Sequence, residues 1–433
     1  MILALLLFAQ AQPLVQAPPP QLTLIKAAHL IDGKTDSVHD GWGVLVEGER
    51  IKDVGPSAQL AARATRTVDL GAATILPGLI DNHTHVLLQG DITAADYDEQ
   101  LLKESNAYRA IRATAAVRTA LMNGFTAMRD VETEGAMYAD VDIKQAIARG
   151  VIPGPRMFVA TRAMAPTGMY PLLGYAWDLK MPEGVQIVDG ADGVRKAVRE
   201  EVKYGADWIK FYADRRYYRT NDPKKPLRSL VNFTDEEAKA LVDEAHRLRR
   251  KVAAHAMGWD GIDAALRAGV DSIEHGDGLT GDLLDRMLQK GTYWCPTMFV
   301  GVYVAEGRGG IWPEMVELEK QAFQAAYKKG IRISYGTDAG GYAWTENQAK
   351  ELSIMVRYGM PPMKAIQSAT SVAAAMLDPL CPPQARECPG SDLGALAKGM
   401  YADVIAVDGD PLKDISTLEH VRFVMKGGAV FKQ

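Results

Sequence analysis

Hydrophobic and polar residues alternate over short stretches at both ends of the chain. The alternation runs through residues 22–75 and again through 392–433, and glycine-containing turns separate its segments. A period of two is typical of short strands that bury one face. Because the two ends of a chain often lie near each other, this pattern predicts one small β-sandwich domain built from both segments.

Between these ends, residues 76–391 follow another pattern, in which short apolar runs alternate with longer segments of helical spacing. Eight runs qualify as strands: TILPGLIDNHTH, FTAMRDV, RMFVATR, DWIKFYA, KVAAHAM, DSIEHGD, TYWCPTM and RISYGTDAG. Several helical segments between them end at Gly124, Gly205 or Gly269, and glycine commonly follows the last helical residue. Repeated strand–helix units predict an α/β fold with a parallel sheet, and eight of them predict a (β/α)8 TIM-like barrel.

Metal-capable side chains collect at the ends of these runs, where such barrels hold their active sites. The set comprises His83 and His85 in the first run, Lys210 in the fourth, His255 in the fifth, His275 in the sixth and Asp338 in the eighth. Residues i and i+2 of a strand face the same side, so His83 and His85 are placed to bind one divalent metal. Each histidine alone also fits a hydrogen-bonded core residue, and Asp338 fits an Asx turn or a helix N-cap.

Lys210 lies between Ile209 and Phe211 in a strand that we expect to be buried. A buried ammonium group is costly unless it is paired or modified. A surface lysine on an edge strand is the alternative, although a closed barrel has no edge. Reaction with CO2 would turn the amine into a carbamate, a carboxylate that can bridge two metals. Two metals about 3.5–4 Å apart polarise a carbonyl and lower the pKa of water from 15.7 to roughly 7.

The order HxH, Lys, His, His, Asp resembles the amidohydrolase superfamily of binuclear metal hydrolases. Within it the chain is most similar to the branch that includes imidazolonepropionase, Xaa-Pro dipeptidases and ochratoxin-hydrolysing amidases. PGLIDNHTH and SYGTDAGG resemble the superfamily's motifs on strands 1 and 8. MPPMKAIQSATSVAAAML is similar to the helix that follows, and LGALAKGMYADVIAVDGDPL to the return into the β-sandwich.

This resemblance implies a centre of two zinc ions, other divalent metals being open, with a CO2-derived carbamate on Lys210 bridging them. His83, His85 and Asp338 would bind the first metal. His255 and His275 would bind the second. A metal-bridged hydroxide would then attack an amide carbonyl, with Asp338 acting as general base and afterwards as general acid.

The segments after the third and fourth strands depart from the branch, because the third-strand loop TRAMAPTGMYPLLGYAW lacks the histidine of many relatives. Tyr170 and Tyr212 are candidates to donate a hydrogen bond to the substrate carbonyl or oxyanion. Arg215, Arg216 and Arg219 either bind a substrate carboxylate or form a solvated loop. The apolar and aromatic residues of 164–177 either wall a pocket for a bulky acyl group or pack the loop.

These features predict a hydrolase that cleaves the amide of a peptide or N-acyl amino acid, including ochratoxin-like compounds, that carries a free carboxylate. One alternative is a hydrolase of cyclic amides or lactones, as the imidazolonepropionase relation implies. A second alternative is a metal-binding protein of the same fold without catalysis.

Composition narrows the partners and the location. The net charge is −5 and no basic stripe occurs, so we do not expect nucleic acid as a partner; a homo-oligomer stays open. The apolar start of residues 1–17 is too short to span a membrane, which predicts no stable membrane anchor. It is typical of a secretory signal except that no basic residue precedes it, so we expect export to the periplasm or medium, or a cytoplasmic protein if it is no signal.

The three cysteines fall into two groups. Cys381 and Cys388 lie seven residues apart in a proline-rich stretch. In an exported protein this spacing suits a local disulfide, and in a cytoplasmic one it suits two unrelated thiols. Cys295 lies in an apolar run and is expected to be a buried thiol.

Overall fold

The computed structural model describes residues 21–90, 95–172, 174–222, 225–378 and 392–433. The predicted leader at 1–17 and the predicted pair Cys381 and Cys388 lie outside these ranges. Among the described residues, no helix combines the length and the apolar character that crossing a bilayer requires.

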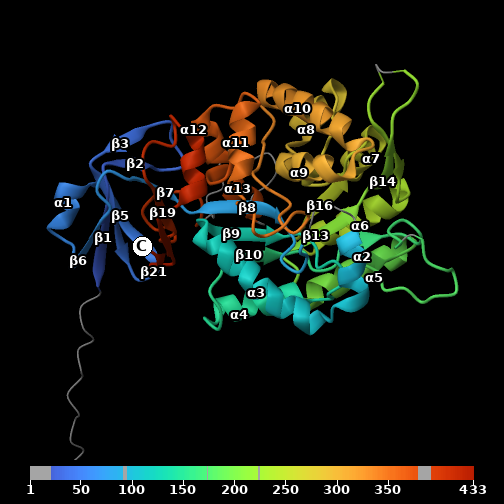
Figure 1. Cartoon of the computed structure of the whole chain (residues 1–433), viewed down its shortest axis with the longest axis horizontal. Coiled ribbons are helices and arrows are strands. Elements are labelled where there is room, and N and C mark those ends of the chain that lie inside the picture. The colour runs from blue at the N-terminus through green and yellow to red at the C-terminus, as the bar shows by residue number, and fades with distance from the viewer. Residues whose placement is uncertain (1–20, 91–94, 173, 223–224, 379–391) are drawn as a thin grey trace, which may run out of the picture.

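Strands from both ends of the chain form two sheets that lie side by side at the left of Figure 1. The first has the order β5-β4-β1-β6 and the second the order β21-β20-β19-β7-β2-β3. Their bounds are β1 (Leu22–Lys26), β2 (His29–Ile31), β3 (Val38–Asp40), β4 (Trp42–Glu47), β5 (Arg50–Pro56), β6 (Arg66–Asp69), β7 (Thr74–Pro77), β19 (Val404–Val407), β20 (Phe423–Lys426) and β21 (Ala429–Lys432). The short helix α1 (Ser57–Ala61) follows β5. Because β19 pairs with β7 and β20, the second sheet needs both ends of the chain.

The central strands β2, β7, β19 and β20 of this second sheet are buried on both faces, which explains their nearly continuous apolar runs. Successive side chains of a strand point to opposite faces. Val404 and Ala406 of β19 pack in the cluster shared with the first sheet, whereas Ile405 and Val407 pack in the large cluster shared with the rest of the molecule. The sheet is therefore a middle layer between the first sheet and the larger α/β part.

The α/β part begins at β8 and contains parallel strands whose pairing is detected in two arcs. One arc has the order β10-β9-β8 and the other the order β12-β11-β13-β16-β17-β18. Their bounds are β8 (Leu79–Thr84), β9 (Phe125–Asp130), β10 (Arg156–Val159), β11 (Met164–Ala165), β12 (Gln186–Ile187), β13 (Trp208–Tyr212), β16 (Lys251–Ala256), β17 (Ser272–His275) and β18 (Tyr293–Cys295). A separate hairpin of β14 (Asp214–Tyr218) and β15 (Arg228–Val231) follows β13.

The 331–339 segment, which holds all but the last residue of the predicted eighth strand RISYGTDAG, is extended but contains no regular strand in the structure. Its residues form only isolated bridges, from Ile333 to Trp294 of β18 and from Ala339 to Thr84 of β8. The ladder is interrupted because the Tyr335 amide donates to Ser368 O instead of to a neighbouring strand. The segment thus lies between the two arcs at one side, while no continuous closed ladder is detected among the described strands.

Helices separate the strands and cover them from outside (Figure 1). They are α2 (Ala95–Lys103), α3 (Asn106–Met122), α4 (Ala139–Ala148), α5 (Ala191–Tyr204), α6 (Asp235–Arg247), α7 (Trp259–Ala268), α8 (Gly281–Lys290), α9 (Met298–Arg308), α10 (Trp312–Lys329), α11 (Lys350–Arg357), α12 (Pro362–Ser368) and α13 (Ser371–Leu377), with a 3-10 helix η1 (Ile415–His420). As predicted, Gly205 and Gly269 end α5 and α7 in the left-handed conformation. The capping box of Thr234 and Glu237 starts α6.

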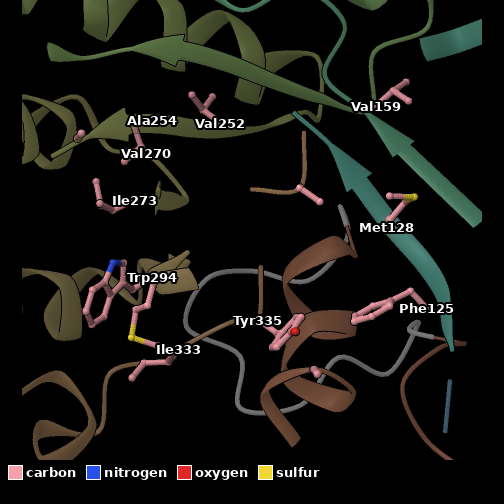
Figure 2. Close-up of a cluster of buried hydrophobic side chains, with 14 of the residues drawn as sticks. Phe125, Met128, Val159, Val252, Ala254, Val270, Ile273, Trp294, Ile333 and Tyr335 are labelled. Carbon is pink, nitrogen blue, oxygen red and sulfur yellow. The ribbon is translucent and has the colours of Figure 1, made fainter. Parts of the chain in front are cut away.

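The core of the α/β part lies among the strands and between strands and helices. Figure 2 shows side chains of this cluster, with Phe125 of β9 beside Tyr335 and with Trp294 of β18 beside Ile333. All four have at most 4% of their surface exposed. These contacts fix the 331–339 segment against its neighbours even where the backbone ladder is interrupted.

Candidate active site

The carboxyl ends of the parallel strands surround one cavity of about 560 Å³. Its lining includes His83 of β8 and His85 just after it, Glu134 after β9, Lys210 and Tyr212 of β13, His255 of β16, His275 of β17 and Asp277 after it, Thr297 after β18, and Asp338. All six predicted metal-capable residues lie in this set. The structure therefore brings together side chains that are up to 255 positions apart in sequence, since His83 and Asp338 share the cavity.

His83, His85 and Asp338 offer ligand atoms that lie within 4.8 Å of one another. Asp338 Oδ1 is 3.1 Å from His85 Nε2 and 3.8 Å from His83 Nε2. Burial lowers the pKa of His83 to about 4, with a further contribution from the Lys210 charge. Burial also opposes the charged form of His85, but the contact with Asp338 outweighs it and raises the pKa of His85 to about 9.

His255 and His275 form the opposite side of the group, with ring centroids 4.6 Å apart. Burial and the neighbouring His83 lower the pKa of His275 to about 3, and burial and His275 hold the pKa of His255 well below its usual value. Both rings are therefore neutral at physiological pH, the form that binds metals. His275 Nδ1 is 2.9 Å from Thr297 Oγ1, and His255 Nε2 is 2.6 Å from the Tyr217 hydroxyl.

Lys210 is 1% exposed, and its ammonium group has no hydrogen bond or ion pair with any described residue. Burial lowers the pKa of its amine, while the carboxylates of Glu274, Glu132 and Asp338 oppose that shift. The strand places its ammonium 5.7 Å from the Tyr212 ring. The costly environment predicted for this lysine is thus present, and the neutral amine is favoured there relative to water.

A buried carboxylate behind the cavity orients His83. Glu274 Oε2 is 2.8 Å from His83 Nδ1, and Glu274 Oε1 accepts a hydrogen bond of 2.8 Å from Arg129 Nη2. Although burial opposes ionisation, Arg129 and His83 hold the pKa of Glu274 well below its usual value. The carboxylate fixes the Nδ1 proton of His83 and leaves Nε2 facing Asp338.

Backbone strain is concentrated around the cavity. His275, Thr297, Asp338 and Glu134 have φ values of 71°, 59°, 61° and 49°. Non-glycine residues rarely adopt this left-handed region, and such residues cluster at functional sites. The strain turns each side chain into the cavity directly after its strand ends.

Two glutamates that the sequence pattern did not single out join the site from the end of β9. The Tyr212 hydroxyl donates to Glu132 Oε2 at 2.6 Å, and the Tyr170 hydroxyl donates to Glu134 Oε2 at 3.1 Å. The two tyrosine oxygens are 3.3 Å apart. The run FTAMRDV, directly followed by ETE, carried the available signal: carboxylates just beyond a predicted strand end.

The three arginines predicted as a carboxylate clamp lie in different places. Arg215 lines the cavity and stacks 4.2 Å from the Tyr170 ring. Arg216 is exposed, and Arg219 Nε pairs with Glu314 at 3.0 Å, so neither lines the cavity. Arg216 follows Arg215 on β14 and points to the opposite face, whereas Arg219 lies beyond the end of β14, after a register shift between Arg215 and Tyr218.

The apolar loop 164–177 walls the cavity only in part. Tyr170 and Leu172 line it, whereas Trp177 is 97% exposed and Tyr175 is 40% exposed. The interpretation of Trp177 and Tyr175 as pocket walls is therefore wrong. Their apolar character could not reveal that residues 174–180 are exposed.

Known proteins are similar to this chain in both sequence and architecture. The model of the amidohydrolase family matches residues 74–431. The ochratoxinase of Aspergillus niger is 30% identical over an alignment of 459 residues, which covers 98% of this chain and 90% of that protein. A solved Xaa-Pro dipeptidase with methionine bound in its active site has a TM-score of 0.81 and 34% identity, covering 95% of this chain and all (100%) of that one. Imidazolonepropionase of Cutibacterium acnes is 26% identical over 84% of this chain and 83% of its own.

Proposed function

The chain belongs to the amidohydrolase family and is a hydrolase of amide C–N bonds, and from this premise we propose that it is a binuclear zinc enzyme. Its substrate would be a peptide or N-acyl amino acid with a free carboxylate. The observation that carries the proposal is the convergence of four histidines, Lys210 and Asp338 on one cavity. We also infer that β8, β9, β10, β13, β16, β17, β18 and the 331–339 segment together make an eight-stranded barrel around it.

The donor set fits two metal ions. His83 Nε2 is buried and has no hydrogen-bond partner, although it faces Asp338. An imidazole nitrogen left in this state costs free energy unless a ligand satisfies it. His83, His85 and Asp338 supply two nitrogens and an oxygen for one ion, and neutral His255 and His275 supply two nitrogens for the other. Zinc ions bound there would lower the pKa of a water molecule and polarise the substrate carbonyl.

Lys210 completes the centre in this proposal as a carbamate. The neutral amine attacks CO2, a C–N bond forms, and one proton leaves, which yields a carboxylate on the lysine side chain. The lowered pKa of Lys210 supports the first step because it increases the fraction of neutral amine. A negative group in place of the ammonium would also offset the positive charge of the two bound metal ions.

Asp338 is placed to move the proton of the reaction. Burial would raise the pKa of Asp338, but its contact with His85 holds that pKa well below the usual value, so the carboxylate starts unprotonated. It accepts a proton from the attacking water and then donates that proton to the leaving amine.

Tyr212 and Arg215 are the proposed substrate contacts. The Tyr212 hydroxyl donates to Glu132 in the present arrangement and would turn to the oxyanion of the tetrahedral intermediate, with Tyr170 as its neighbour. Arg215 would pair with the substrate carboxylate. Arg216 and Arg219 have no such part, because they point away from the cavity.

The test is a hydrolysis screen of zinc-loaded protein against dipeptides, N-acyl amino acids, cyclic amides and lactones. We expect about two zinc ions per chain, activity on the open-chain amides and its loss on chelation. The double variant His83→Ala/His85→Ala should be inactive. The matched control is His246→Ala, because His246 lies on helix α6 and its imidazole pairs with Asp271. Lys210→Ala should recover activity with an added short carboxylate. Full hydrolysis by the double variant would overturn the proposal, and a preference for lactones would redirect it to cyclic substrates.

A further inference from the structure

Two buried carboxylates line the cavity apart from the six metal-capable residues and Glu134. Asp277 lies just after β17, and Glu319 projects from α10. Their exposed fractions are 6% and 4%. Gly301 of α9 faces Glu319. A Cβ atom added at Gly301 would have Glu319 Oε2 as its nearest neighbour, at 3.5 Å. The proposed mechanism leaves both carboxylates without a part.

Neither carboxylate forms an ion pair with a described residue, and Asp277 Oδ2 is buried without a hydrogen-bond partner. Other deeply buried carboxylates of the chain are compensated. Glu274 pairs with Arg129, and Glu351 accepts bonds from the amides of Met298 and Phe299. An unpaired carboxylate in such a place costs several kcal/mol in typical proteins, so the exception calls for a missing partner.

The missing partner should be cationic and come from within the cavity. Burial and the nearby Asp277 raise the pKa of Glu319 well above its usual value, and Arg308 of the same cavity lining lies over the Trp312 ring instead of pairing with Glu319. Val300, Val304 and Trp312 line the same part of the cavity. Apolar and aromatic walls beside two carboxylates suit an alkyl chain that ends in a positive charge.

We propose that Asp277 and Glu319 form a subsite for a cationic nitrogen of the substrate, either a lysine or arginine side chain or a free α-ammonium group. This inference rests on the proposed function, because it concerns the substrate of the same cavity. Arg215 then receives the carboxylate of that substrate, and the two carboxylates receive its positive end. A neutral apolar group at the same place would leave both buried charges unpaired.

Matched substrates test the subsite on the zinc-loaded, full-length enzyme. Three pairs differ by one ammonium group: alanyl-lysine against alanyl-norleucine, lysyl-alanine against norleucyl-alanine, and alanyl-alanine against N-acetyl-alanyl-alanine. We expect kcat/KM for the cationic member of at least one pair to be about tenfold higher or more, as a charged hydrogen bond allows. The pair with the preference identifies whether a side chain or the α-ammonium group is bound.

Variants assign the preference to the two carboxylates. Glu319→Gln and Asp277→Asn keep the shape and remove the charge, and each should bring the ratio of kcat/KM for that pair close to one. Glu317→Gln is the matched control on the same helix, because Glu317 is exposed and pairs with Lys320. Its ratio should equal that of the unmodified enzyme. Ratios below threefold for all pairs, or a preference that survives in both cavity variants, would overturn the proposal.

A binding measurement separates this inference from the proposed function. If no amide is hydrolysed, the proposed function fails, and the subsite is tested by the thermal shift that lysine and norleucine give the same protein. A larger shift with lysine that Glu319→Gln abolishes supports the subsite. Equal shifts, or a shift that only added divalent metal produces, overturn it.

Discussion

At the scale of single residues, Gly336 shows how tightly the first histidine is held. A methyl group at this position would collide with Cys295 Sγ and lie 2.9 Å from His83 Cβ. Both neighbours are buried, and His83 has 0% exposure. The absent side chain is therefore what lets the 331–339 segment approach β8.

We predict that Gly336→Ala lowers the free energy of unfolding by about 1–3 kcal/mol and reduces zinc content, because overpacking displaces His83. Chemical denaturation and metal analysis measure both effects. Adding Cys295→Ala should recover part of the loss by removing the colliding sulfur. Gly193→Ala in α5 is the control, since nothing lies within 4 Å of a side chain there. A stable, zinc-replete Gly336→Ala protein would contradict the prediction.

Glu274 allows a second prediction at this scale. Its contact of 2.8 Å fixes the proton of His83 Nδ1, so Glu274→Gln should weaken zinc binding by about 10–100-fold. Competition with a chromogenic chelator measures the affinity. Ser272→Ala removes a donor to the same carboxylate but keeps its charge, and we expect a change below about threefold. Unchanged zinc affinity in Glu274→Gln would show that His83 needs no such partner.

Site residues could be predicted from the sequence where they stood near the end of a predicted strand. The four cavity histidines, Lys210 and Asp338 stood at strand ends and share the cavity as expected. Glu132, Glu134 and Glu274 were missed, because a carboxylate in sequence does not reveal whether it is buried beside a tyrosine or an imidazole. The roles of the arginines were also beyond reach, because the hairpin that separates Arg215 from Arg219 has no clear signal.

At the scale of elements, charge contacts tie α5 to α6. Glu244 of α6 accepts hydrogen bonds of 2.6 Å from Arg199 Nε of α5 and 3.1 Å from Arg247 Nε of its own helix. The Arg247 and Arg199 contacts lower the pKa of Glu244 to about 2 from a usual value of 4.5. The ionised form thus favours the folded state.

We predict that Glu244→Gln lowers the melting temperature by about 1–2 °C at neutral pH, a small effect because both arginines are largely solvated. A folded pKa below the unfolded one gives stability that is complete above pH 4.5 and is lost as the pH falls towards about 2. Melting curves of both proteins should therefore differ by a constant amount from pH 6 to 8 and converge as the pH falls from 4.5 towards about 2. A difference that grows on acidification would refute this cause.

Most helices and strands were predictable, because the repeat of their apolar positions continues over many residues or because a glycine marks their end. Gly205 and Gly269 fixed the ends of two helices. The eighth strand was predicted as regular, yet Tyr335 bonds to Ser368 and leaves only bridges. The first predicted strand is two strands in the structure, because β7 belongs to the sheet built from both chain ends and β8 to the strands around the cavity. A single apolar run cannot reveal that a chain changes layers at Gly78.

At the scale of the whole molecule, the middle sheet couples the chain ends to the cavity. Its strands place Phe423 and Met425 against the first sheet and Val424 against the α/β part. Lys426 and Lys432 also reach across to the carbonyls of Gly154 and Met122. Loss of packing on one face of this sheet should therefore also destabilise the strands that pack on its other face.

We predict that Phe423→Ala, at a fully buried position (0% exposed), costs about 3–5 kcal/mol of unfolding free energy. Hydrogen exchange should then accelerate in β7 and β19 and equally in β8 and β9. Val430→Ala in β21 is the control, because Val430 is 39% exposed and its loss should change stability by about 0.5 kcal/mol or less. Acceleration confined to the terminal sheets would show that the two parts unfold independently.

The shared middle sheet has a consequence for biosynthesis. A ribosome finishes β7 at Pro77 but does not reach β19 until Val404, a delay of roughly 15–65 s at about 5–20 residues per second. During that time β7 lacks its antiparallel partner β19, and its bonding edge is open to other chains. Nascent chains of this protein should therefore require a chaperone until translation ends, and chains that terminate before β19 should be the ones that aggregate.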